Sequence, residues 1–373
     1  MPNRSSDIVG AELVVPCSDL GKTLGFFTKT LGFRLDMIFP ADDPRIAVIS
    51  GHGTCLRLER DGTGPTGTLR LLVSDPDNFA EGQTVLHAPN GMRIELVDAN
   101  PPLIMPETRH GFHVRHIKDS APWVIGRAGM HYRDLVPDRL GGSLIASHIR
   151  IPDGGPVPDM VHYHTVGFQV IYCYRGWVRL VYEDQGEPFI LKAGDCVLQP
   201  PEIRHRVLEA SDELQVVELG CPAEHITTID HDMELPTGRL DPEKDFSGQI
   251  FCRHQAETAE WAPWRIPGFE TRDTGIGRAT RGTASVQVIR PSAGVAESPV
   301  TSHNTDILFA FILEGQMTLR GEGQTPQTLE PGDAFVIPPD TKTRLCACSD
   351  DLQFLEASLP ANFETSLYEE QEL

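Results

Sequence analysis

The stretch from His162 to His205 holds three histidines and a glutamine at the spacing of a metal site. His162 and His164 are two residues apart, and because alternate side chains of a strand share a face, both point to the same side. Gln169 follows a short turn-like segment, and His205 comes from a separate strand that lies beside the first once a barrel closes. Neutral imidazoles and an amide oxygen are ligands that iron, manganese, nickel, copper or zinc accept. The sequence therefore predicts a divalent metal ion bound by His162, His164, Gln169 and His205.

This spacing resembles the two motifs of the cupin superfamily. The first motif is Gly, His-x-His, three or four residues, Glu, six residues and Gly, and the second is Gly, five residues and Pro-x-Gly-x-x-His. The matching residues are His162, His164, Gln169, Gly176, Gly194, Pro200 and His205. The resemblance implies a small β-barrel in which the three histidines bind the metal. Gln169 is then either a fourth, weak ligand or a hydrogen-bond partner near the metal.

Two residues depart from these motifs. Gln169 replaces the usual glutamate, which bears on the charge of the metal site, and Glu202 stands where the second motif has glycine, which bears only on a turn. Three neutral histidines and a neutral amide leave the full charge of a divalent ion uncompensated. Such a site prefers an anionic ligand such as an enolate, a thiolate, a carboxylate or a phenolate. We therefore expect a small anionic substrate.

The resemblance also implies a class of reaction. Iron with three histidine ligands and open positions can hold both an anionic substrate and dioxygen, as in the β-diketone and thiol dioxygenases among the cupins. The first hypothesis is a non-haem metal enzyme, in the first place an Fe(II) dioxygenase, with Mn, Ni, Cu or Zn as alternatives to iron. A rival in the same class is a lyase or isomerase that uses the metal only as a Lewis acid. The second hypothesis is a non-catalytic protein that binds or senses a metal or a small ligand.

Two further side chains are candidates for catalysis by strand parity. Cys173 falls on the same face as Gln169, and Glu209 falls on the same face as His205. Either could contact substrate or serve as a base, and Gln169 itself is a third candidate. A buried cysteine in a strand is more often inert packing, so Cys173 is the weaker of the two.

The chain contains an internal duplication. The distance from Asp134 to His164 is 30 residues, and so is the distance from Asp273 to His303. Each copy continues with a glycine, then Gly-Asp and a double proline at matching intervals. In the second copy the four ligand positions hold Thr301, His303, Leu308 and Thr343. One imidazole among an aliphatic side chain and two hydroxyls is not a metal site, so we expect metal in the first copy only.

Composition narrows the function classes. The 373 residues carry a formal net charge of -21, with 53 acidic and 32 basic side chains, which argues against binding to nucleic acid or anionic membranes. The eight cysteines form no paired framework, and Met1 to Gly10 has no signal-type pattern. No stretch approaches the roughly 18 apolar residues of a membrane span. We expect a reduced, cytoplasmic protein and, by resemblance to bicupins, a homodimer.

The first hundred residues follow a different pattern. A strand from Ala11 to Val15, a helix that ends at Gly32, and three strands give the order βαβββ. This order resembles the glyoxalase and extradiol-dioxygenase family, the vicinal oxygen chelate proteins. A shortened second module would run from Gly67 to Ala99. The family's ligand positions fall on Glu12, Thr68 and Glu95, a poor set for iron or zinc, which favours a metal-free pocket or surface positions for the two glutamates.

The predicted fold is mostly β, with an N-terminal βαβββ glyoxalase-like domain followed by two tandem cupin barrels of the double-stranded β-helix type. The expected boundaries are 8–100 for the glyoxalase-like domain, 101–127 for a linker, 128–225 for the metal-binding barrel, 226–260 for a second linker and 261–362 for the degenerate barrel. His110, His113 and His116 lie in the first linker, and we expect them to be exposed histidines rather than a second metal site.

Overall fold

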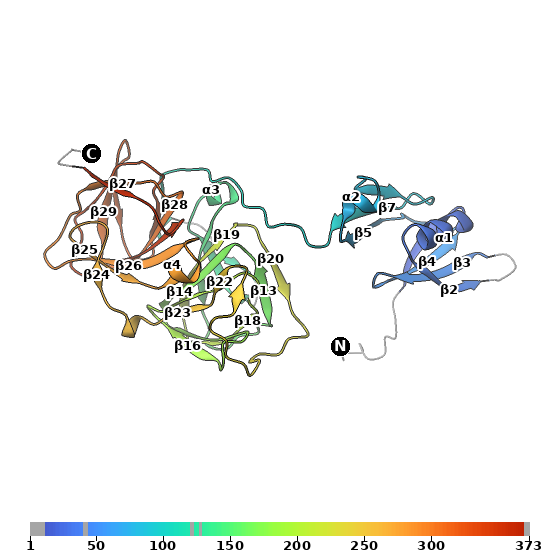
Figure 1. Ribbon diagram of the computed structural model, residues 1–373, viewed down its shortest axis with the longest axis horizontal. Helices are drawn as coiled ribbons and strands as arrows, with labels where there is room; N and C mark the ends of the chain where they lie inside the picture. The colour runs from blue at the N-terminus through green and yellow to red at the C-terminus, as the bar shows by residue number, and fades with distance from the viewer. Residues whose placement is uncertain (1–11, 40–43, 120–122, 127–128, 369–373) are drawn as a thin grey trace. The chain divides into compact units, whose positions relative to one another are not determined.

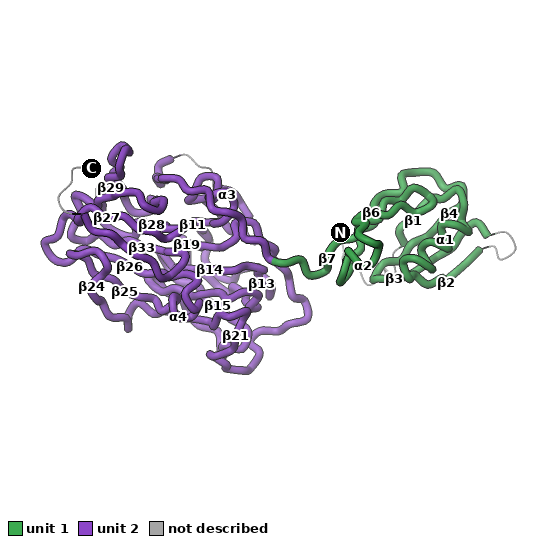
Figure 2. The backbone as a smooth tube through the Cα atoms, turned by 45° about the horizontal axis from the view of Figure 1, so that its top comes forward, with its two compact units in different colours: residues 1–102 green, residues 103–373 purple. Residues whose placement is uncertain are grey.

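Strands are far more frequent than helices in this chain, and the computed structural model describes residues 12–39, 44–119, 123–126 and 129–368. The chain divides into two units, residues 1–102 and 103–373, shown in green and purple in Figure 2. The expected domain start at residue 8 and the end of the first linker at residue 127 lie outside the described residues. No helix among the described residues is long and apolar enough to cross a membrane.

Unit 1 has two small sheets that share one apolar core. The first sheet has the order β1-β4-β3-β2, with β1 parallel to β4, and the second has the order β5-β7-β6. The side chain of Asp19 caps the helix by accepting a hydrogen bond from the Lys22 backbone N at 3.0 Å. The elements are β1 (Leu13–Cys17), α1 (Leu20–Lys29), β2 (Arg34–Phe39), β3 (Ile46–Gly51), β4 (Thr54–Arg60), β5 (Thr68–Val73), α2 (Pro76–Phe79), β6 (Val85–His87) and β7 (Arg93–Asp98). The expected order βαβββ is present, and the second module is shortened, with a single helical turn.

The acidic residues of unit 1 singled out above lie in exposed or half-exposed ion pairs. Glu12 lies 3.6 Å from Arg57 and Glu95 lies 3.1 Å from Arg93, measured between side-chain oxygen and nitrogen. Both carboxylates already have a basic partner. Among the described residues of this unit, no group of three or more histidine, cysteine or acidic side chains is close enough to hold a metal ion.

Unit 2 contains two barrels that Figure 1 shows in green to yellow and in orange to red. The first barrel has two facing sheets, ordered β23-β17-β14-β19-β11-β10-β9 and β16-β15-β18-β13-β20, with β12 paired to β18. Its elements are β9 (Val124–Ile125), β10 (His131–Asp134), α3 (Arg139–Gly142), β11 (Ile145–Ile151), β12 (Gly155–Pro156), β13 (His162–Thr165), β14 (Phe168–Arg175), β15 (Trp177–Tyr182), β16 (Phe189–Lys192), β17 (Cys196–Leu198), β18 (His205–Ala210), β19 (Leu214–Cys221), β20 (Ile226–Ile229), the hairpin β21 (Asp245–Phe246) and β22 (Gln249–Ile250), and β23 (Cys252–His254).

The second barrel repeats this arrangement. Its sheets are ordered β24-β25-β26-β33-β28-β31-β8 and β30-β29-β32-β27-β34. Its elements are β8 (His113–Arg115), η3 (Ala256–Thr258), β24 (Ala262–Pro263), β25 (Phe269–Asp273), α4 (Ile276–Ala279), β26 (Ser285–Pro291), β27 (Val300–His303), β28 (Ile307–Glu314), β29 (Met317–Gly321), β30 (Gln327–Leu329), β31 (Ala334–Val336), β32 (Thr343–Cys346), β33 (Gln353–Leu359) and β34 (Thr365–Tyr368). The predicted duplication is therefore seen strand by strand.

Both segments expected as linkers contribute strands. β8, which precedes the first barrel in the chain, pairs with β31 of the second barrel, and β23, which follows the first barrel, pairs with β17 of that barrel. His116 next to β8 places its Nδ1 2.9 Å from the buried carboxylate of Asp333, and His110 places its Nε2 2.6 Å from Asp306. These histidines tie the first segment to the second barrel, and none of the three belongs to a metal-type cluster of the described residues.

Strand β14 shows how the two barrels are joined. Phe168, Val170 and Tyr172 lie in one apolar core that also contains side chains of β28 and β33 from the second barrel. The alternate residues Ile171 and Cys173 face the interior of the first barrel. Because β14 carries apolar side chains on both faces, with the polar Gln169 on the inner one, it serves the core between the barrels and the wall of one barrel at the same time.

Candidate metal centre

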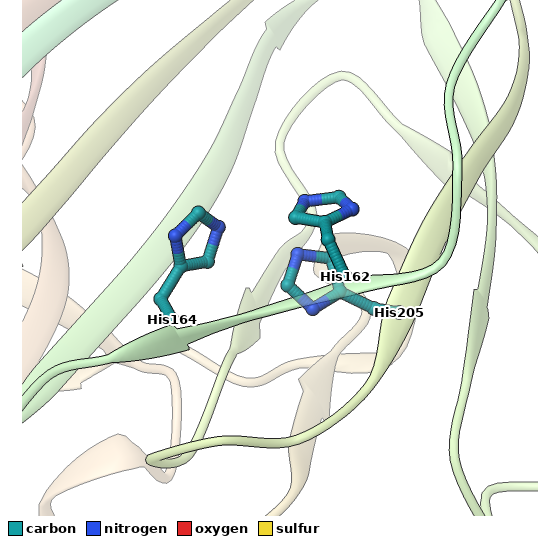
Figure 3. A group of neighbouring side chains, drawn as sticks. All are labelled: His162, His164 and His205. Carbon is teal, nitrogen blue, oxygen red and sulfur yellow. The ribbon is translucent and has the colours of Figure 1, made fainter. Parts of the chain in front are cut away.

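His162, His164 and His205 converge in the first barrel. Their ligand nitrogens lie within 4.8 Å of one another, and His162 on β13 pairs directly with His205 on β18. Figure 3 shows His162 and His164 projecting from one strand, with His205 beside His162. His162 and His205 are buried, with 0% and 3% of their surface exposed. The structure thus brings together the three histidines that the sequence selected.

The hydrogen bonds of the three rings set which nitrogen can bind a metal. His162 Nδ1 lies 2.8 Å from the Met160 carbonyl oxygen, and His205 Nδ1 lies 2.9 Å from the Ile203 carbonyl oxygen. A carbonyl only accepts, so Nδ1 of each ring carries the proton and Nε2 keeps the lone pair. His164 Nδ1 lies 2.9 Å from the hydroxyl of Thr227, which leaves Nε2 of that ring for a metal as well. Partners of this kind orient histidine ligands in metal sites, so the three rings fit a divalent ion.

Gln169 is not among the side chains that line the cavity of the three histidines. It is buried, and its Nε2 donates a hydrogen bond to Glu218 on the neighbouring strand β19 at 2.6 Å. This hydrogen bond is the contact that the structure shows for Gln169, and its role as a metal ligand stays a prediction. Because the amide nitrogen faces Glu218, the amide holds that carboxylate in place.

Glu218 is a site residue that the sequence reasoning missed. It lines the same cavity as the histidines and faces inward with Leu214 and Val216 of β19. The duplication carried a signal for it, because Glu356 occupies the corresponding position: Glu218 pairs with Ile171 as Glu356 pairs with Ala310. A carboxylate therefore does lie in the first barrel, on β19 rather than at the motif position that Gln169 occupies on β14. With this carboxylate, the net positive charge expected at a bound divalent ion falls by one unit.

Cys173 faces the barrel interior but lies away from the cavity wall. It is fully buried, and its Sγ lies 3.5 Å from the carbonyl oxygen of Gly176. Burial raises the pKa of the Cys173 thiol to about 12. The thiol is therefore protonated at neutral pH, as expected for a packing residue.

Glu209 lies on the outer face of the barrel. Strand parity predicted that it would face the same way as His205, and a β-bulge makes that prediction wrong. Between β15 and β18 the register shifts, because Leu180 pairs with Val207 whereas the preceding residue, Arg179, pairs with Glu209, two residues further along β18. The extra residue in β18 reverses the alternation. Val207 accordingly lines the cavity, and Glu209 forms an exposed ion pair with Arg179 at 2.9 Å.

The histidines open into a cavity of about 430 Å³ inside the first barrel. Gln199 is buried beside it and donates to the hydroxyl of Tyr182 at 3.0 Å, and the Tyr182 ring stacks 5.5 Å from the ring of His205. The lining consists of apolar side chains and a smaller polar group, namely Met130, Tyr132, Ile145, Ser147, Ile149, Ile151, His162, His164, Ile171, Val178, Leu180, Tyr182, Gln199, His205, Val207, Leu214, Val216, Glu218, His225 and Thr227. A volume of this size is within the usual range for a small-molecule site.

In the second barrel a positively charged side chain, Arg265, lies near the residues that correspond to the histidine positions of the first barrel. Arg265 donates two hydrogen bonds to the buried carboxylate of Glu356, at 2.7 and 2.8 Å, and its guanidinium stacks over Trp264. Neither ring nitrogen of the buried His303 has a hydrogen-bond partner among the described residues. Burial, with a smaller contribution from Arg265, lowers the pKa of His303 to about 4. The neighbouring cavity measures only about 30 Å³. The expectation that the second copy lacks a metal site fits this arrangement.

Comparisons with known proteins agree with the two-barrel architecture. Residues 147–219 and 287–355 each match the cupin domain family, so the chain carries two cupin domains in tandem. Salicylate 1,2-dioxygenase from Pseudaminobacter salicylatoxidans is similar in structure, with a TM-score of 0.53 and 16% identity over 71% of this chain and 90% of that chain. No curated protein sequence matches the chain.

Two oxalate decarboxylases are also similar in structure. The enzyme from Bacillus subtilis, which has Mn(II) centres, gives a TM-score of 0.50 and 13% identity over 70% of this chain and 81% of that chain. The formate complex of the enzyme from Lactobacillus farciminis gives a TM-score of 0.50 and 15% identity over 71% of this chain and 91% of that chain. At these identities the likeness establishes the bicupin fold alone.

Proposed function

We propose that the first barrel is the active site of a metal-dependent enzyme, namely a non-haem Fe(II) dioxygenase that acts on a small anionic substrate. The observation that carries the proposal is the convergence of ligand nitrogens from three histidines, within 4.8 Å of one another, at the wall of a ligand-sized cavity. The proteins of similar fold reported above include a dioxygenase and decarboxylases, which supports an enzymatic barrel.

His162, His164 and His205 would hold the metal. Iron bound by three imidazoles keeps coordination positions for an anionic substrate and for dioxygen, and it supplies the redox chemistry that a dioxygenase needs. Manganese is the first alternative, because the similar decarboxylase from Bacillus subtilis has Mn(II) centres.

The protein's own groups tune the charge and orientation at this site. Nδ1 of each histidine is held by an oxygen of the protein, which keeps the ring fixed. Gln169 holds Glu218 at 2.6 Å, so one negative charge stays at the cavity wall. The apolar side chains around the remainder of the cavity exclude water, which strengthens the electrostatic interactions within it.

We propose that unit 1 is a metal-free domain of the glyoxalase type. The order βαβββ and the parallel pairing of β1 with β4 support this assignment. The ion pairs of Glu12 and Glu95 with arginines support the absence of a bound metal. Elemental analysis of the triple variant His162→Ala/His164→Ala/His205→Ala tests it, since this variant has lost all three histidine ligands of the first barrel and any metal that it retains would belong elsewhere.

Oxygen consumption tests the proposed reaction. The full-length protein is purified without added ions, its metal content is measured, and β-diketones, thiols and phenolic acids are supplied in an oxygen electrode. Metal-dependent oxygen uptake in wild type and in His303→Ala, but not in His162→Ala, is the expected result. Turnover under nitrogen would replace the dioxygenase with a Lewis-acid lyase or isomerase. Binding of these anions without turnover in either atmosphere would leave a sensor.

A further inference from the structure

The cavity of the first barrel is long as well as large. On β11 the lining residues run from Ile145 to Ile151, and on the neighbouring β19 they run from Glu218 back to Leu214. Ile151 pairs with Leu214, and six residues away Ile145 pairs with Gly220. Six residues of a strand extend about 20 Å, so the lining follows most of the length of the barrel wall.

The two ends of this cavity differ in polarity. The histidine end is fixed by the pairing of Tyr182 with His205, and the opposite end by the pairing of Val178 with Ala210. The polar lining residues other than Tyr132 gather at the histidine end, namely Ser147, His162, His164, Tyr182, Gln199, His205, Glu218, His225 and Thr227. The walls toward the opposite end are apolar and consist mainly of Ile149, Ile151, Val178, Leu180, Val207, Leu214 and Val216.

The lining contains no fixed positive charge. Among the described residues that line the cavity there is no lysine and no arginine. A bound divalent metal would be the positive charge there, and Glu218 would offset one of its two charges. The remaining single charge suits one monoanionic group. A second anionic group on the same ligand would have to be buried against aliphatic walls without a partner, which is costly.

The second barrel explains why the first has this space. Three short side chains of the cavity wall, Val178, Val207 and Val216, correspond to Met317, Leu345 and Phe354 by strand register. Those longer side chains belong to the closely packed interior core of the second barrel, and the cavity that remains beside them measures about 30 Å³. The same backbone thus encloses either a filled core or a long cavity, according to the size of a few side chains.

We infer that the ligand of the first barrel is an elongated amphipathic molecule, with one monoanionic chelating head at the three histidines and an apolar tail along β11 and β19 toward Val178. This inference rests on the proposed function, because the head requires the metal. It excludes compact dianions such as oxalate as the preferred ligand. The tail contributes affinity through the apolar surface that it buries.

A homologous series of straight-chain alkyl hydroxamates tests the inference on the metal-loaded, full-length protein. The hydroxamate is a monoanionic chelator, and calorimetry measures the affinity from acetohydroxamate upward. Affinity should rise by about fourfold per methylene until the tail fills the cavity. Oxalate should bind more weakly than the longer hydroxamates. Affinity that is independent of chain length, or oxalate as the tightest ligand, would overturn the inference.

A variant that takes its side chain from the corresponding position of the second barrel tests whether the tail lies in the cavity. Val216→Phe should leave the affinity for acetohydroxamate and the metal content unchanged, while the affinity for long-chain hydroxamates falls at least about tenfold. Val178→Met is the milder version and should shorten the longest tail that fits. Equal affinity of Val216→Phe and wild type for every chain length would place the tail elsewhere. The wild-type series decides the question even if Val216→Phe does not fold.

The binding series and the proposed reaction fail separately. Length-dependent binding with no oxygen uptake would leave the amphipathic ligand in place and remove the dioxygenase. Oxygen uptake with a short substrate, together with length-independent binding, would remove the amphipathic ligand alone. His162→Ala, which lacks one metal ligand, should lose the affinity for acetohydroxamate, and retention of that affinity would show that the head does not bind at the metal.

Discussion

The two barrels share their backbone and differ in what occupies the interior. In the first, the Glu202 backbone N donates to the His164 carbonyl at 3.0 Å, and in the second the Asp340 backbone N donates to the His303 carbonyl at 2.7 Å. Around this common turn, the first barrel has three histidines and a cavity, whereas the second has an arginine paired with Glu356 and a filled core. Both barrels carry a carboxylate at the corresponding position, and in the second barrel an arginine accompanies it, whereas in the first we propose that a metal ion does so.

Removing a histidine should show the difference in metal binding between the two barrels most clearly. His162→Ala or His205→Ala should weaken metal binding roughly a thousandfold, because one of three ligands accounts for about a third of a binding free energy of about 10–16 kcal/mol. His303→Ala should leave the metal content unchanged. Metal analysis after dialysis against a weak chelator measures both. Similar loss in all three variants would contradict the asymmetry between the barrels.

The histidines could be predicted because their placement depends on local rules. Parity along β13 and the spacing to His205 are properties of the sequence itself, and the duplication follows from equal intervals. Glu209 could not be placed, since a bulge in β18 changes parity and leaves no mark in the sequence. The bond from Gln169 to Glu218 depends on the register between two strands that are 49 residues apart along the chain. The strand β8 required knowledge of a pairing partner more than 200 residues away.

Removing the arginine should harm only the second barrel. Arg265→Met leaves the carboxylate of Glu356 buried without its partner and should lower the free energy of unfolding by about 3–5 kcal/mol. The double variant Arg265→Met/Glu356→Gln should recover most of this loss, because the buried charge is gone. Urea denaturation measures both. A cost below about 1 kcal/mol for the single variant would mean that solvent already screens the pair.

Acid should act on His303 in the second barrel. Its pKa lies near 4 in the folded protein and near 6.5 in the unfolded chain, so the unfolded chain binds an additional proton between these values. The folded state is favoured fully above pH 6.5 and loses about 3 kcal/mol of stability as the pH falls to 4. His303→Phe should reduce this loss by that amount. The difference between the two proteins, measured by urea denaturation at pH 7 and pH 4.5, removes the contribution of His148, whose pKa is also lowered to about 4 by burial.

Adding a second carboxylate to the first barrel should weaken its anionic ligands. Gln169→Glu brings a second carboxyl group to hydrogen-bond distance from Glu218, so the two groups share a proton near neutral pH and both ionise only at higher pH. Once that proton is lost, the extra charge should lower the affinity for acetohydroxamate about tenfold. The swap Gln169→Glu/Glu218→Gln keeps one carboxylate and one amide, and should restore most of the affinity. Calorimetry across a range of pH measures this, and equal affinity in wild type and Gln169→Glu at every pH would mean that the charge at this position does not affect the metal site.

The smallest expected effect concerns the turn that the barrels share. Glu202 and Asp340 both have a positive φ, 62° and 61°, a conformation that favours glycine. Glu202→Gly should relieve about 1 kcal/mol of backbone strain, offset in part by the greater freedom of glycine in the unfolded chain. Asp340→Gly should gain less, because aspartate tolerates this conformation better than glutamate does. If denaturant unfolding instead gives equal changes, the two turns are equivalent, and the difference between the barrels lies entirely in the side chains that line their interiors.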